Sequence, residues 1–221
     1  MVLLNTAGGL TGGDRMALRL QADAGAHVVT STQAAERAYR AMPDSWAKVD
    51  LTLQLGSGAR IDWLPQETIL FEGAALTRQL HADLAADSRL LLVEPVILGR
   101  PAMGEILHAA ALRDRWEVRR DGALVFADAL RLEGDVTEIM ARSGVAGAAG
   151  AFASILYAAP DAGQHVAPLR ALLPQSGGAS LIREGILFAR MLARDGFELR
   201  RSLTPVIEYL SGARLPKVWR L

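Results

Sequence analysis

The sequence contains no cysteine among its 221 residues. Disulfide bonds and metal sites built from thiolates are therefore excluded, and a reducing compartment is compatible with the composition. Neither sign of charge is in excess, because 24 Lys and Arg residues balance 24 Asp and Glu residues. This balance gives no indication of nucleic acid or an anionic membrane as a partner.

Targeting and membrane-spanning segments are also absent from the sequence. No basic segment followed by a long apolar run is present near Met1, so no signal peptide is recognisable. The longest apolar run, residues 88–99, contains Arg89, Glu94 and Pro95. It is shorter than the about 20 residues that a spanning helix needs. We therefore expect a soluble, cytoplasmic protein without a membrane partner.

The first two thirds of the chain alternate between apolar and polar residues, as strands with one buried face do. Turn residues separate these runs at a spacing typical of all-β proteins. Residues 90–98 are almost continuously apolar and predict a strand buried on both faces, with a break near Pro95, which cannot donate to a ladder. The alternating strands are predicted at residues 2–5, 16–21, 27–31, 46–55, 75–81 and 112–118.

The last third changes character. Strands are predicted at residues 151–158 and 185–193, and helices at 162–173 and 197–210. Pro205 predicts either a kink in the second helix or a start near Ser202. The sequence therefore predicts a mainly β protein with about two α-helices near its C-terminus.

Two glycine pairs followed by Asp14, in the segment LLNTAGGLTGGDR, are reminiscent of a phosphate-binding loop. A Walker loop needs Lys and then Ser or Thr after its last glycine, but Asp14 and Arg15 stand there. A dinucleotide loop opens a helix, whereas a strand pattern follows here. The favoured interpretation is a hairpin between strands 2–5 and 16–21, with glycines supplying positive φ. Asp14 then caps the turn or faces a cavity.

The histidines give no metal site by spacing. His81 with Asp83, or His27 with Asp23, could contribute to a weak nickel or zinc site. The nucleophile motif G-x-S-x-G is absent as well.

Several carboxylates lie in or beside apolar segments, namely Glu36, Glu67, Glu94 and Glu105. Buried carboxylates usually pair with arginine, and Arg37, Arg40 and Arg100 are close in sequence. Ion pairs are one interpretation and a polar internal path for ions or water is another. A catalytic carboxylate pair in a β cavity also stays open.

Five segments together resemble the urease accessory protein D family in order and spacing along the whole chain. They are LLNTAGGLTGGD (3–14), STQAAERAYR (31–40), WLPQETILFEGA (63–74), LGRPAMGE (98–105) and RLPKVWRL (214–221). Their motif positions include Gly8, Gly9, Gly12, Gly13, Arg37, Tyr39, Pro65, Gln66, Gly99, Arg100 and Gly104.

The resemblance implies one domain over residues 1–221, with elongated, β-helix-like stacking and two helices near the C-terminus. It implies a non-enzymatic maturation factor that binds the urease apoprotein and urease accessory protein F, which recruits the GTPase accessory protein G. No cofactor is expected to be tightly bound, and nickel would be present only in transit. The alternatives are an interaction module without metal transit and an all-β cavity hydrolase or lyase using clustered carboxylates.

The matching motifs also supply candidate site residues. Asp14, Glu67 and Glu105 are expected to line a wet internal channel for nickel, with ion pairs or turn caps as the alternative. Residues 202–210 are expected to dock accessory protein F, unless they only pack on the core. Family members begin several dozen residues before the glycine segment, which implies a late start or a fragment lacking strands, with an unpaired edge.

Overall fold

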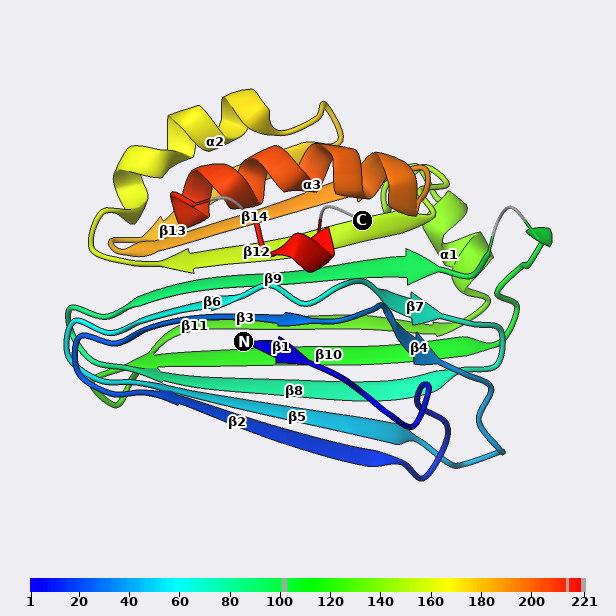
Figure 1. Ribbon diagram of the computed structural model, residues 1–221. Coiled ribbons are helices and arrows are strands. Elements are labelled where there is room, and N and C mark those ends of the chain that lie inside the picture. The colour runs from blue at the N-terminus through cyan, green and yellow to red at the C-terminus, as the bar shows by residue number, and fades with distance from the viewer. Residues whose placement is uncertain (101–102, 214, 220–221) are drawn as a thin grey trace.

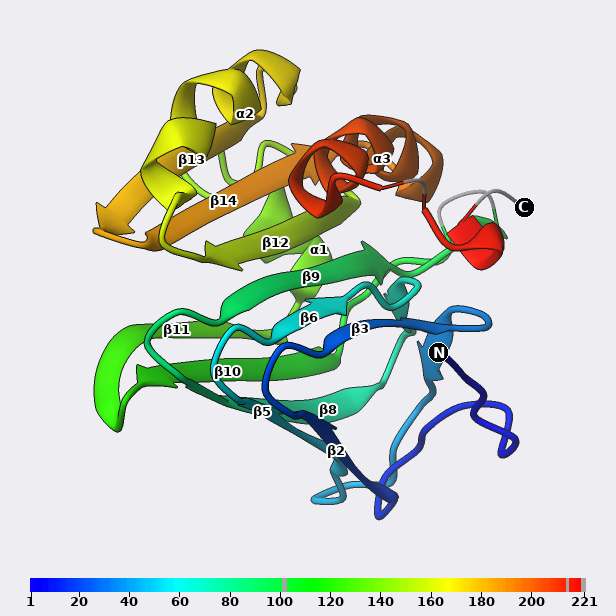
Figure 2. The ribbon, with the colours of Figure 1, turned by 60° about the vertical axis from the view of Figure 1, so that its left-hand side comes forward.

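A computed structural model describes residues 1–100, 103–213 and 215–219. Figures 1 and 2 show two sheets lying face to face, with helices α2 and α3 on the outer side of one of them. In spatial order, the five-stranded sheet consists of β11 (Ala123–Gly134), β10 (Ala110–Arg120), β8 (Ala75–Leu84), β5 (Ala47–Leu55) and β2 (Arg15–Ala22).

The second sheet has nine strands. Its main path is β1 (Val2–Leu3), β3 (His27–Thr32), β6 (Arg60–Trp63), β9 (Arg89–Leu98), β12 (Ala151–Ala158), β14 (Ile186–Ala193) and β13 (Gly177–Arg183). Two short strands extend it, β7 (Thr68–Leu70) on β9 and β4 (Glu36–Ala38) on β7. The helices are α1 (Val136–Ala141), α2 (Val166–Leu172) and α3 (Gly196–Ser211), with the 3₁₀ segments η2 (Ala162–His165) and η3 (Lys217–Trp219).

The first half of the chain forms stacked coils. The chain passes from β2 to β3 and β4, then from β5 to β6 and β7, then from β8 to β9. Equivalent strands pair in parallel, so that Leu18, Leu51 and Leu80 lie side by side. Because the apolar residues of each coil align with those of the next, stacking buries one continuous interior. The prediction of a mainly β, β-helix-like fold is confirmed.

The second half of the chain builds antiparallel strands onto this stack. β11 forms a hairpin with β10, and β12 pairs with β9 on one side and β14 on the other. The apolar side of α3 then packs onto this sheet through Leu199, Leu203, Val206, Ile207 and Leu210. None of the helices in the described ranges is long and apolar enough to cross a membrane.

The central strand β9 confirms the prediction for residues 90–98. Leu90 and Leu92 pack between the two sheets, whereas Leu91 and Val93 pack toward the helices. The expected break near Pro95 is also present, because β6 pairs with β9 only as far as Leu92 and β7 resumes at Val96. On its other side, β9 pairs with β12 without interruption.

Two local predictions are wrong. Strands 2–5 and 16–21 do not form a hairpin, because β1 and β2 belong to different sheets. The helix predicted at residues 197–210 is present as α3, but the alternative start near Ser202 is wrong, because the helix begins at Gly196 and continues through Pro205. The Asp195 side chain accepts a hydrogen bond from the Glu198 amide (2.9 Å) and caps the earlier start. The predictions also omitted α1 and the strands β4, β6, β7, β11 and β13.

Candidate functional site

The glycine loop crosses from one sheet to the other. Gly8, Gly9 and Gly13 have φ values of 80°, 147° and 91°, so the positive φ expected of a tight connection is present at three of the four glycines. At Gly12 the φ value is not positive, and glycine is favoured because a Cβ there would lie only 2.5 Å from the Ser45 hydroxyl. Asp14 is exposed, and its Oδ2 accepts a hydrogen bond from the Thr11 amide (2.8 Å), which caps the turn.

The motif residues of successive coils stack at this end of the molecule. A Cβ on Gly9 would lie 2.5 Å from the Tyr39 ring, which stacks on Phe71 with 5.1 Å between centroids. The Arg100 guanidinium lies 4.8 Å from the centroid of the same Phe71 ring. Arg37 donates a hydrogen bond to the Tyr39 hydroxyl (3.4 Å). The glycine loop is therefore the first member of a contact series that joins three coils.

Replacing Gly9 with alanine is expected to cost about 2–4 kcal/mol of unfolding free energy, from the strained φ together with the clash against Tyr39. The matched control is Gly8→Ala, where φ is also positive but nothing lies within 4 Å of the new Cβ. Urea denaturation of both variants measures the difference. Equal losses in the two variants would show that the contact with Tyr39 contributes nothing.

Glu105 lies in the loop that closes this series. Its carboxylate accepts hydrogen bonds from Arg100 (2.9 Å) and from the Glu72 amide (3.2 Å). Burial raises the pKa of Glu105, but these donors outweigh burial and hold it below the ordinary value. Gly99 and Gly104 turn the loop with φ values of 67° and 69°. Pro101 and Ala102 of the same motif lie outside the described residues.

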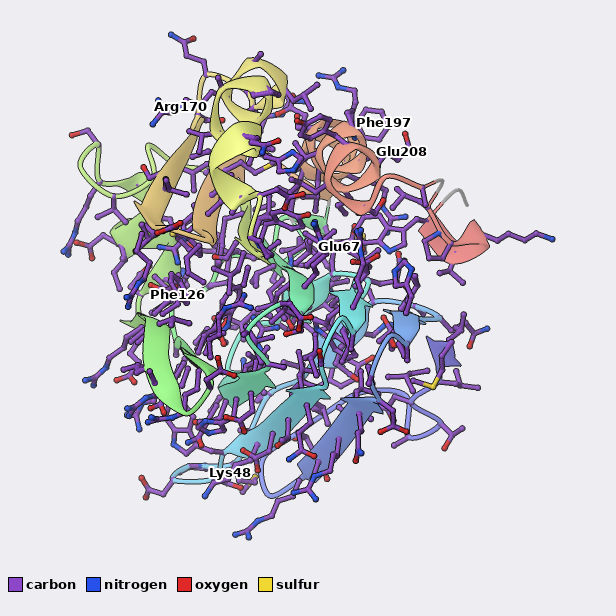
Figure 3. The ribbon with its side chains drawn as sticks, turned by 90° about the vertical axis from the view of Figure 1, so that its left-hand side faces the viewer. Lys48, Glu67, Phe126, Arg170, Phe197 and Glu208 are labelled. Carbon is purple, nitrogen blue, oxygen red and sulfur yellow. The ribbon has the colours of Figure 1, made fainter. Side chains whose placement is uncertain are left out.

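Glu67 is buried against the last helix, and Figure 3 shows it between α3 and the strands below. The Arg200 guanidinium donates to both of its oxygens, at 2.9 and 2.7 Å, and also to the Gln66 side chain. The same guanidinium lies 5.1 Å from the Trp219 ring centroid, and Trp219 donates to the Leu64 carbonyl. Glu67 therefore joins the coil to α3 and η3. Arg214, Arg220 and Leu221 of that terminal motif lie outside the described residues.

The structure does not bring Asp14, Glu67 and Glu105 together. Each has its own partners, at the glycine turn, under α3 and in the loop after β9. The predicted ion pairs with neighbouring arginines are present only at Glu105, which pairs with Arg100.

The other partners come from distant segments. Glu67 pairs with Arg200, Glu94 pairs with Arg78, and Glu36 accepts hydrogen bonds from Asn5. The expectation that Glu67 and Glu94 form ion pairs is confirmed, but their partners are not the arginines close to them in sequence.

A cavity of about 440 Å³ lies between the two sheets beside the glycine loop. Gly8, Gly9 and exposed Gln33 border it, and buried Trp63 and Glu94 lie at its inner end. Its other lining residues include apolar Leu18, Leu51 and Leu76, and polar or motif residues Asn5, Glu36, Arg37, Pro65, Gln66 and Arg78. The cavity thus leads from the surface to a buried carboxylate.

A buried ionic network lies at the inner end of this cavity. Arg78 on β8 contacts Glu94 on β9 in the opposite sheet, and Asp114 on β10 (2.5 Å) in its own. The indole of Trp63 donates to Glu94 (2.8 Å), and that of Trp116 donates to Asp114 (3.0 Å). One guanidinium thus holds two carboxylates and joins the facing sheets.

Burial disfavours the charges on Glu94 and Arg78. Burial raises the pKa of Glu94 above its ordinary value, and Arg78 and the Trp63 indole offset only part of that effect. Burial also opposes the charge on Arg78, but Asp114 and Glu94 outweigh it and raise the pKa of the guanidinium. The Nε of Arg78 and the Nε2 of Gln66 have no acceptor among the described residues. Both side chains line the cavity, where water could accept from them.

Sequence reasoning missed Arg78 and Asp114. A signal for Arg78 was present, because it lies between Leu76 and Leu80 on the apolar face of an alternating strand. A charged residue in that position must find a buried partner. Its partner Glu94 was noted in its apolar run, but nothing in the sequence indicates that the two strands face each other.

The histidines do not gather into a metal site. The described ranges hold no group of three or more His, Asp or Glu side chains that could bind an ion. His27 lies 3.0 Å from Asp62, not beside Asp23, and His81 lies 3.9 Å from Glu117. The two weak pairings considered from the sequence therefore do not form.

Comparisons with known proteins agree with the segments that suggested the family. A family described as UreD urease accessory protein matches residues 1–220. A urease accessory protein UreD of Rhizobium leguminosarum bv. viciae is 48% identical over 100% of this chain and 81% of its own length. Relatives with the same description from Roseobacter denitrificans and Ruegeria pomeroyi are each 45% identical, over 99% and 100% of this chain and 80% and 86% of their own lengths. The chain therefore belongs to the UreD urease accessory protein family.

Proposed function

We propose that this protein is a non-catalytic scaffold that binds the urease apoprotein while nickel is inserted into its active site. The family match over residues 1–220 carries the proposal, because the relatives are named urease accessory proteins. In the proposed assembly, accessory protein F binds the scaffold, and the GTPase accessory protein G joins through F.

We further propose that nickel passes through the cavity between the sheets. The cavity supports this route because it leads from the surface to Glu94 and is bordered by a second carboxylate, Glu36. Carboxylate oxygens bind nickel weakly enough to release it, which suits a cargo that must move on. An alternative route for nickel would pass along Asp14, Glu67 and Glu105 instead of through this cavity. Loss of urease nickel in their alanine variants, with Glu36 and Glu94 variants unaffected, would favour that version.

The exposed side of α3 is the proposed docking surface for accessory protein F. The apolar side packs on the core, but Phe197 at the start of the helix is 75% exposed. Figure 3 shows Phe197 and Glu208 on the helix surface. A large exposed aromatic side chain is typical of a binding surface.

Co-purification tests this docking surface. Phe197→Asp is expected to lower recovery of accessory protein F about tenfold, since one well-packed aromatic anchor contributes at least about 1.4 kcal/mol. Leu124→Asp is the control, because Leu124 is also exposed (47%) but lies in the β10–β11 hairpin. Unchanged recovery with Phe197→Asp would move the docking surface elsewhere without affecting the scaffold role, which binding of the urease apoprotein tests separately.

A further inference from the structure

The outer face of the five-stranded sheet carries a row of four cations with one threonine among them. Outward-facing residues of neighbouring strands are in register, so that Arg15, Lys48, Thr77 and Arg113 follow one another across β2, β5, β8 and β10. Arg131 on β11 lies opposite Arg113 and completes the row. Because neighbouring strands are about 4.8 Å apart, the row spans about 19 Å. Figure 3 shows Lys48 at the side of the molecule away from the helices.

The charges in this row are poorly compensated. Arg15 is directly opposite Lys48, and neither side chain has an ion-pair partner among the described residues. Arg113 and Arg131 share a single carboxylate, Glu133, whose pKa their hydrogen bonds lower to about 2. Like charges directly opposite on neighbouring strands destabilise a sheet. The row therefore opposes folding locally, which is expected of residues kept for binding rather than for stability.

A hollow lies over the unpaired end of the row. It has a volume of about 660 Å³ and is lined by Arg15, Lys48 and Arg113, with Trp46 among its walls. The Arg113 guanidinium lies 4.3 Å from the Trp46 ring centroid, so the hollow has an aromatic wall beside its cations. Asp44 and Asp50 also line it.

We propose that this surface binds a short acidic segment of a partner protein in an extended conformation. Acidic side chains at every second residue of an extended chain are about 6.7 Å apart, so four of them cover about the length of the row. The neutral residues between them could pass Asp44 and Asp50. A nucleic acid strand, with a charge on every phosphate, would meet both carboxylates and fits the surface less well. The inference goes beyond the proposed function and concerns the outer face of the five-stranded sheet, whereas the cavity lies between the two sheets.

Fluorescence anisotropy with a labelled octapeptide of alternating Glu and Ser tests the proposal on the full chain. The double variant Arg15→Glu/Lys48→Glu is expected to weaken binding at least about tenfold at low salt, where opposite charges attract most strongly. The control is Arg183→Glu/Arg201→Glu, which makes the same change in net charge at two exposed arginines on β13 and α3. Binding to the control is expected to stay within about twofold of the unmodified chain.

The milder variant Arg15→Gln/Lys48→Gln keeps the test valid if charge reversal disturbs folding. It should also weaken binding, while its thermal midpoint does not fall, because a repulsion has been removed. Absence of binding to the unmodified chain, or equal losses in both charge-reversed variants, would overturn the proposal. Tighter binding of an eight-nucleotide single-stranded DNA than of the peptide would overturn it in favour of nucleic acid.

Discussion

Replacing Arg78 with methionine is expected to lower the unfolding free energy by about 3–5 kcal/mol, because it leaves two buried carboxylates without their cation. Arg78 is 6% exposed and is the only described side chain that contacts both Glu94 and Asp114. Methionine preserves most of the volume, so the loss reports charge rather than packing. Urea denaturation at pH 7 measures it.

The loss should depend on pH. The pKa of Glu94 is raised in the folded state, so folding favours the protonated carboxyl. The stability that Glu94 contributes is therefore complete below its ordinary pKa of 4.5 and is lost as pH rises through its folded-state pKa. Without Arg78 this loss of stability grows. The difference in unfolding free energy between the variant and the unmodified chain should therefore widen from pH 5 to pH 8. The triple variant Arg78→Met/Glu94→Gln/Asp114→Asn should recover most of the stability. A loss below about 1 kcal/mol for Arg78→Met alone would contradict this role for the network.

Replacing Glu94 with glutamine is expected to lower the rate of nickel loading of co-expressed urease about tenfold, the effect of losing about 1.4 kcal/mol of stabilisation for the passing ion. Glutamine keeps the shape and an acceptor for the Trp63 indole but removes the negative charge at the inner end of the cavity. Nickel per urease active site, measured by mass spectrometry at short induction times, follows the loading rate.

Two further variants make the Glu94 result interpretable. Glu36→Gln changes the other carboxylate bordering the cavity and should act in the same direction. Glu184→Gln removes an exposed carboxylate between β13 and β14 and should have no effect. Gel filtration must show that each variant still assembles with the urease apoprotein. Normal loading by an assembled Glu94→Gln variant would reject the cavity as the route.

The strand pattern was predictable because it depends on local alternation. Val49, Leu51 and Leu53 alternate with polar residues whatever sheet they belong to, and the apolar run of β9 indicates burial on both faces. The glycine loop shows what local alternation cannot predict. Positive φ at Gly8 and Gly9 was predictable, but whether a turn closes a hairpin or crosses between sheets depends on partners far along the chain.

The site was less predictable for the same reason. The Asp14 cap and the Glu105–Arg100 pair are local, three and five residues apart, and both were among the expected interactions. The Glu67–Arg200 pair joins residues 133 positions apart, and sequence spacing does not predict contacts over that separation. The cavity itself arises from the packing of two sheets, so its lining could not be derived from single-strand patterns.

Co-expression with urease is the direct test of whether this chain supports urease maturation. The urease structural subunits and accessory proteins F and G are produced with and without this chain, and nickel per active site and urease activity are measured. Both quantities are expected to depend on this chain. Equal nickel content and equal activity in its absence would contradict this role in urease maturation.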